Sequence, residues 1–261
     1  MLSIIKASLY KLIKDRPFKV TLIVGVVLAI IFTLFYSFVL PELSGGYNML
    51  LISSSPTNNF GIAIPINLVV FIIGEFNYGT IRNKIIAGNK RLNIYIALFI
   101  MGLIFSFSLM TVYVGMSTLL GTILKGFFVG GRSATPGEVW ATVGYTAIVY
   151  LTLTALSVLT ATGIRHIGGS ITVTIIVIVV ASVAGLLTYV NCTLDGSSLP
   201  EFHYLINPLL ILSVTTGSMG LLSGTTGEVG RIILFNILSN AIYTAIFLGS
   251  GILLFMNRDI K

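Results

Sequence analysis

The sequence has few charged residues. Only 9% of its 261 residues are charged, whereas a soluble domain carries roughly 25%. Hydrophobic residues make up 56% of the chain, and the mean hydropathy is +1.03. A water-soluble fold of this size could not bury that much apolar surface. The composition therefore excludes an ordinary soluble domain and favours a membrane protein.

Several residue patterns that carry chemistry are also missing. The lone Cys192 excludes an internal disulfide and a cysteine cluster, and neither His166 nor His203 has an HExxH-type neighbour. No lysine follows a glycine, so the chain has no GxxxxGK[ST] phosphate loop. No charged residue lies at the middle of an apolar block, which disfavours a proton or ion pathway. We therefore predict no catalytic residue, no metal site and no cofactor bound by this chain, and any ATP hydrolysis with its Mg²⁺ must belong to a separate partner subunit.

Long uncharged blocks are the main feature of the chain. Each exceeds the ~20 residues that a spanning helix needs, and the blocks are 20–41, 43–74, 92–124, 139–164, 166–194, 202–227 and 232–257. In lipid every backbone polar group must be paired, which leaves helices or closed barrels. Because the blocks are continuous rather than alternating, we predict an all-α integral membrane protein with a single transmembrane domain over residues 1–261.

Six spans are predicted, because block 202–227 is a poor spanning helix. It contains Asn207-Pro208 and two Gly-, Ser- and Thr-rich stretches, and its apolar run is too short to cross a bilayer. We interpret residues 195–228 as a re-entrant helical element on the extracellular side. It contains Asn207 and Pro208, and at its end Glu228 and Arg231 lie three residues apart on a helix. A seventh span in this block is the alternative.

The distribution of basic residues predicts the orientation. With six spans, twelve basic residues fall in cytoplasmic segments and three (Lys125, Arg132 and Arg231) fall outside. This bias places both termini in the cytoplasm of a multi-pass membrane protein. The formal net charge of +7 lies beside the spans, where it suits anionic membrane lipid, so we do not expect nucleic acid as a partner.

The N-terminus is predicted to form an amphipathic helix within residues 1–16. Leu2, Ile5, Leu9 and Leu12 recur at helical spacing, while Lys11 and Lys14 turn away from that face. Such a helix would lie on the inner leaflet. A solvated basic leader that only sets the topology is the other interpretation.

Small residues recur four positions apart within several of the spans. Such spacing allows helices to pack closely in lipid, and the pairs are Ser117/Gly121, Ser157/Ala161 and Ala181/Gly185. We expect them to form packing seams inside one subunit or between subunits.

The most polar stretch, residues 75–91, lies between the second and third predicted spans. Helical spacing puts Tyr78, Ile81 and Ile85 on one face and Lys84, Gly88 and Arg91 on another. This pattern predicts a short amphipathic helix at the cytoplasmic membrane surface. The alternative is a solvated loop whose basic residues only hold the adjoining spans in place.

The same stretch resembles the first cytoplasmic loop of ABC-2 type transporter permeases. The resemblance rests on the string Glu75-x-x-x-Gly79-Thr80-Ile81-Arg82-Asn83, with Gly88 and Arg91 before a long apolar block, and on the layout of the whole chain. This family includes bacterial antimicrobial-peptide immunity and export permeases. In it the loop is the coupling helix that docks on the ATPase. The resemblance implies a docking role for Glu75, Tyr78, Gly79, Thr80, Arg82, Gly88 and Arg91.

The function that the resemblance implies is the permease subunit of an ATP-driven exporter in the bacterial cell membrane. In such a permease the outer element 195–228 would close the translocation path, with Asn207, Pro208, Glu228 and Arg231 as candidate gate residues. The partners of the subunit would be two copies of a cytoplasmic ABC ATPase, a second permease subunit in a homo- or heterodimer, and membrane lipid. The substrate would be an amphipathic peptide or another hydrophobic molecule, and the chain would not be an enzyme itself. A membrane scaffold or sensor that transports nothing is the first alternative, and a lipid-modifying membrane enzyme is the second.

Overall fold

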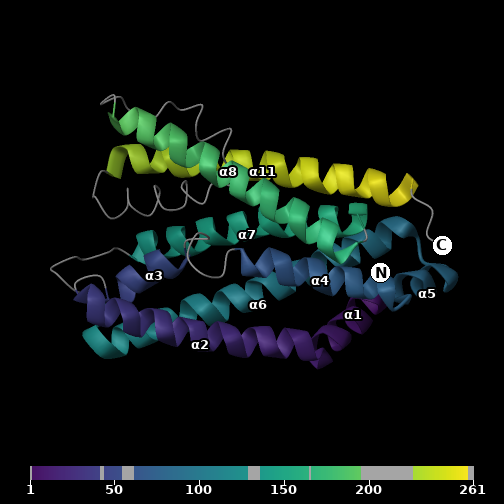
Figure 1. The fold of residues 1–261 in the computed structure, drawn as a ribbon, viewed down its shortest axis with the longest axis horizontal. Coiled ribbons are helices and arrows are strands. Elements are labelled where there is room, and N and C mark those ends of the chain that lie inside the picture. Colours follow the sequence, from purple (N-terminus) through teal and green to yellow (C-terminus); the bar gives the residue numbers. More distant parts are fainter. Residues whose placement is uncertain are drawn as a thin grey trace.

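The structure, a computed structural model, describes residues 2–41, 44–54, 62–128, 136–164, 166–194 and 226–257. The described residues are almost entirely helical and contain no strand. The helices are α1 (Leu2–Lys14), α2 (Arg16–Val39), α3 (Gly46–Ser54), α4 (Ala63–Asn77), α5 (Thr80–Ile86), α6 (Arg91–Lys125), α7 (Pro136–Ile164), α8 (Ile167–Leu194) and α11 (Thr226–Asn257). Figure 1 shows the long helices running along the long axis of the molecule, with α1 and α5 at one end.

Within the described ranges, four helices are long and apolar enough to cross a membrane. They are α2, α6, and the segments Thr146–Ile164 of α7 and Ile237–Asn257 of α11. The pair α4 and α5, bent by 53° at the break between them, gives a fifth if it counts as one span. An all-helical chain with several apolar helices is therefore confirmed. The sixth span stays a prediction, because α8 contributes only the shorter apolar segment Ile167–Val180.

The second predicted span is not kinked at its proline. Pro65 is the third residue of α4, in the first turn, where a proline removes no intrahelical hydrogen bond. The Asn67 amide donates to the Ala63 carbonyl at 2.8 Å, so this polar side chain is satisfied within its own helix.

The first part of the uncharged block 43–74 forms a separate short helix that sequence analysis did not predict. Helix α3 is short and almost wholly buried, and it packs against the far end of α6. Gly121 of α6 makes this contact possible, because a Cβ there would lie 2.7 Å from the Met49 side chain and 3.0 Å from the Ser44 carbonyl oxygen. The Ser117/Gly121 pair is thus a seam inside the subunit, since Ser117 is also buried. The structure does not describe how Ala181 and Gly185 of α8 pack, so this third pair stays a prediction.

Helix α7 holds the centre of the bundle and carries many buried hydroxyl groups. Ser106 of α6 and Thr154 pair at 2.8 Å, and Thr160 and Thr174 of α8 pair at the same distance. Thr152 donates to the Asn240 side-chain oxygen of α11 at 2.8 Å. Neutral hydrogen bonds between helices therefore connect α7 to three neighbours, as expected for helices that associate in lipid. The predicted Ser157/Ala161 pair is also buried on this helix.

The periphery of the bundle is apolar. Helix α2 exposes eight large hydrophobic side chains before its last two residues, and α11 exposes Ile237, Leu238, Ile242, Ile246, Leu253 and Leu254. Exposed apolar surface of this extent is unfavourable in water and suits contact with lipid.

Candidate functional site

A turn and a short helix connect α4 to α6 at one end of the molecule (Figure 1). Gly79, with φ of 65°, precedes α5, and Gly88, with φ of 82°, follows it. Both values lie in the left-handed region that glycine occupies without a steric penalty. Helix α5 packs its inner side on the core through Ile81, which is 1% exposed, and through Ile85. The sequence therefore specifies a separate surface helix and not a continuation of α4.

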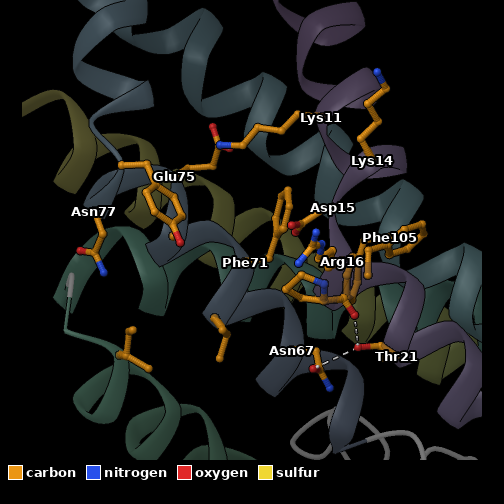
Figure 2. A pocket seen from close by; sticks show the side chains of 16 residues that line it. Lys11, Lys14, Asp15, Arg16, Thr21, Asn67, Phe71, Glu75, Asn77 and Phe105 are labelled. Atoms are coloured by element: carbon orange, nitrogen blue, oxygen red, sulfur yellow. Dashed lines mark hydrogen bonds and ion pairs between the residues drawn. The ribbon is translucent and has the colours of Figure 1, made fainter.

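Glu75, in the last turn of α4, is the centre of a charged cluster. It is 2% exposed, and its two carboxylate oxygens pair with two lysines from other helices. Lys11 of α1 contacts Oε1, and Lys84 of α5 contacts Oε2 at 3.2 Å. Figure 2 shows Lys11 extending from α1 to Glu75. One buried carboxylate thus joins three helices.

Both lysines make a second hydrogen bond within the same region. Lys11 donates to Thr80 Oγ1 at 3.2 Å, and Lys84 donates to Ser8 Oγ at 3.0 Å. We refer to Ser8, Lys11, Glu75, Thr80 and Lys84 as the Glu75 cluster. A carboxylate that pairs with two cations, each supported by a hydroxyl group, is compensated for its burial. Removing the carboxylate would leave two ammonium groups near the apolar core.

Two orientations expected from the sequence are wrong. Lys11 and Lys84 were expected on faces turned away from the apolar sides of their helices, yet both point inward to Glu75. Leu12 is buried as expected, and α1 is present as a helix. The helical periodicity sorts side chains around one axis, whereas the buried carboxylate on α4 attracts a lysine from each neighbour.

The outer side of α5 exposes a large apolar side chain beside a cation. Ile86 is 71% exposed, and Arg82 is also exposed. Tyr78, in the turn before α5, is 81% exposed. Tyr78 was expected to share a face with Ile81 and Ile85, but it precedes Gly79 and lies outside the helix. Ile86 was not predicted as a site residue. The adjacent isoleucines at 85 and 86 could have indicated it, since neighbours on a helix cannot face the same side. We call Arg82 and Ile86 the outer face of α5. The exposed Tyr78 ring instead lies near Lys11, whose Nζ is 5.7 Å from the ring centroid.

Arg91, another predicted docking residue, has a structural contact. It is the first residue of α6, and its Nη1 donates to the Met256 carbonyl in the last turn of α11 at 2.9 Å. A cation at a helix C-terminus pairs with carbonyls that have no partner in the helix. This contact places the C-terminal end of α11 beside the start of α6. Helix α1 lies at the same end of the molecule, because Lys11 and Lys84 both contact Glu75.

Asp15 lies between α1 and α2, near the Glu75 cluster. Burial raises the pKa of its carboxyl above the ordinary value of 3.8, and the neighbouring Glu75 charge acts in the same direction. Lys11 and the backbone N–H of Arg16 oppose the shift. The pKa is raised overall, so Lys11 and the Arg16 N–H do not fully offset the effect of burial on the Asp15 carboxylate.

The predicted extracellular gate is not described. Asn207 and Pro208 lie outside the described residues, as does most of the predicted element 195–228. Glu228 and Arg231 fall in the first turns of α11, where their side chains are outside the described set. In the described part of the chain, no group of three His, Cys, Asp or Glu residues could hold a metal ion.

Comparison with known proteins gave no match: no family model, no curated protein and no solved structure is similar enough to this chain to indicate a relationship.

Proposed function

We propose that this chain is the membrane-spanning permease subunit of an ATP-driven exporter, and that a separate cytoplasmic ATPase docks on the outer face of α5. The observation that carries the proposal is the anchoring of α5. Its inner side is attached to α1 and α4 through Glu75, while Tyr78, Arg82 and Ile86 remain exposed. A docked partner needs such a helix, because motion of the partner can then reach the spans through rigid contacts.

The distribution of charge supports a cytoplasmic position for α5. The basic helix α1 and the basic segment 82–91 lie at the same end of the molecule, as the Lys11 and Lys84 contacts with Glu75 require. Clustering of basic residues beside spans is typical of the cytoplasmic side. The resemblance of residues 75–91 to the coupling loop of ABC-2 type permeases agrees with this orientation.

The proposed assembly contains two permease chains and two ATPase subunits in a bacterial cell membrane. Its substrate class is an amphipathic peptide or a similarly hydrophobic molecule. The described bundle has an apolar periphery and a neutral, hydroxyl-bonded centre, which suits an uncharged path better than an ion path.

The test is affinity purification from native membranes in mild detergent, followed by mass spectrometry. The natural chain should recover a P-loop ATPase. An Arg82→Glu, Ile86→Ser variant should recover at least about tenfold less, because removing central interface contacts commonly costs ~2 kcal/mol or more. Lys6→Glu is the matched control, since it reverses an exposed cation on the same side of the molecule, on α1, and it should recover as much ATPase as the natural chain.

Three outcomes would contradict the proposal or a part of it. Absence of an ATPase in several detergents would remove the transporter assignment. Recovery of an ATPase whose hydrolysis is not stimulated by the chain in proteoliposomes would indicate a scaffold or sensor instead. Equal recovery with the natural chain and the double variant would exclude the outer face of α5 as the docking surface.

A further inference from the structure

A partly open cavity of about 670 Å³ lies where the α1–α2 corner faces α4. Phe105 of α6 and Ile167 of α8 complete its wall, and Figure 2 shows it from close by. The volume falls in the range of ~300–1,000 Å³ that is typical of small-molecule sites. It is large enough for a polar head group with the first part of an attached chain.

The cavity has a charged mouth and a less polar wall. Lys14, Asp15 and Arg16 line it at the corner between the two helices, and Val70, Phe71 and Phe105 supply apolar surface. Two polar residues of the wall form hydrogen bonds within the protein: Thr21 donates to the Pro17 carbonyl at 2.9 Å and Asn67 donates to the Ala63 carbonyl at 2.8 Å.

Arg16 is the cation that remains available to a ligand. Of the other cations at the cavity, Lys11 is engaged by Glu75, and Lys14 lies over the Tyr10 ring, 4.4 Å from its centroid. Figure 2 shows the Arg16 side chain turned into the cavity and the Lys14 ammonium turned away from it. Arg16 makes no ion pair with the described residues. A guanidinium presents a planar fork of donors that matches two phosphate oxygens.

The position of the cavity identifies the source of the phosphate. Arg16 is the first residue of α2, the first helix long and apolar enough to span, so the mouth lies at the level where a bilayer begins. Three cations, Lys11, Lys14 and Arg16, and two anions, Asp15 and Glu75, are among the residues that line the cavity. The local charge therefore favours a net negative head group over a zwitterionic one.

We infer that this cavity binds an anionic glycerophospholipid from the leaflet that meets α1, with the phosphate on Arg16 and an acyl chain beside Phe71 and Phe105. This site does not depend on an ATPase partner. A lipid there would contact α1, α2 and α4 together, and would occupy the space beside the Glu75 cluster.

The test is native mass spectrometry of the delipidated full-length chain with phosphatidylglycerol, phosphatidylcholine or inorganic phosphate added at equal concentration. Phosphatidylglycerol should bind with a stoichiometry of one to each chain. Arg16→Gln should weaken that binding about fivefold, which is the effect of one basic residue near an anionic membrane surface. Val70→Trp places a large side chain in the cavity and should abolish phosphatidylglycerol binding.

Two matched variants control for charge and bulk. Lys19→Gln removes an exposed cation of α2 that does not line the cavity, and Ile23→Trp adds the same bulk on the exposed side of α2. Neither should change binding. Equal binding of phosphatidylcholine, displacement by inorganic phosphate alone, or equal losses in the controls and the cavity variants would each overturn the inference. An amphipathic peptide that binds here while phosphatidylglycerol does not would also overturn it.

Discussion

The Glu75 cluster and the centre of the bundle along α7 use different polar chemistry. At the end of the molecule, one buried carboxylate holds two lysines from separate helices. Around α7, Thr152, Thr154 and Thr160 bond to neutral oxygen groups of α11, α6 and α8. Charges are expensive at the bilayer centre and tolerated near its surface. Depth in the membrane therefore determines which polar groups can join helices.

The first prediction removes the charge at the centre of the Glu75 cluster. Glu75→Gln leaves Lys11 and Lys84 without a counter-ion, and breaking a buried ion pair costs ~3–5 kcal/mol. Because Lys11 keeps 41% of its side chain exposed, we expect about 2–4 kcal/mol. The measurement is thermal unfolding in detergent, together with faster hydrogen exchange in residues 2–14 as α1 detaches.

The matched control for charge is Lys6→Gln, which removes an exposed cation of α1 and should leave both readouts unchanged. A triple variant, Glu75→Gln with Lys11→Met and Lys84→Met, should recover most of the lost stability, because neutral partners no longer need the carboxylate. A Glu75→Gln chain as stable as the natural one would refute the structural role of the cluster.

The second prediction concerns the hydrogen bond between α7 and α11. Asn240→Leu removes the amide that Thr152 contacts at 2.8 Å, but Thr152 keeps Thr244 as a partner at 3.0 Å. Because hydrogen bonds between spanning helices average ~0.6 kcal/mol, we expect a loss of about 0.5–1.5 kcal/mol in the same unfolding experiment. Ser250→Ala, which removes a hydroxyl bonded only within α11, should have almost no effect. If Asn240→Leu lost more stability than Glu75→Gln, the neutral contacts around α7 would stabilise the fold more than the Glu75 cluster does.

The third and smallest effect is a pH dependence at Asp15. Since burial raises the pKa of this carboxyl above 3.8, the folded chain binds the proton more tightly than the unfolded chain. Protonated Asp15 therefore stabilises the folded chain below pH 3.8, and this stabilisation is lost as the pH rises through the folded-state pKa. Asp15→Asn should therefore be slightly more stable than the natural chain at pH 7, and the difference should shrink as the pH approaches 3.8. A difference that grows on acidification would show that the pKa is lowered instead.

Much of the fold follows from patterns within single segments. The uncharged blocks predicted the apolar helices α2, α6, α7 and α11, and the leucine spacing of the N-terminus predicted α1. The polar stretch 75–91 predicted a short surface helix, present as α5 between Gly79 and Gly88. Helix α3 was missed, because an apolar segment within a Gly- and Ser-rich loop has no periodicity to identify it, and its burial depends on the end of α6.

The candidate site was predicted only in part. Glu75 and Arg82 were selected from the motif, but Lys11 and Ser8, separated from Lys84 by 73 and 76 positions in the sequence, carry no local signal of contact with it. Arg91, which was predicted for docking, bonds to the end of α11, a contact for which the sequence carried no signal. Ile86 was overlooked because only its neighbour Ile85 fits the apolar face.

The sequence by itself determined that the described chain is helical, with several segments long and apolar enough to span a membrane, because backbone groups in lipid must pair within each apolar segment. It also determined that a short surface helix follows the second apolar block, although the break at Gly79, where glycine adopts positive φ freely, was not predicted. Tertiary structure decided which side chains meet. Helical periodicity assigns each residue a direction around its own axis, whereas the neighbour in that direction is set by how the helices pack. For that reason Lys11 and Lys84 became partners of Glu75, and Arg16 became the open cation of the cavity.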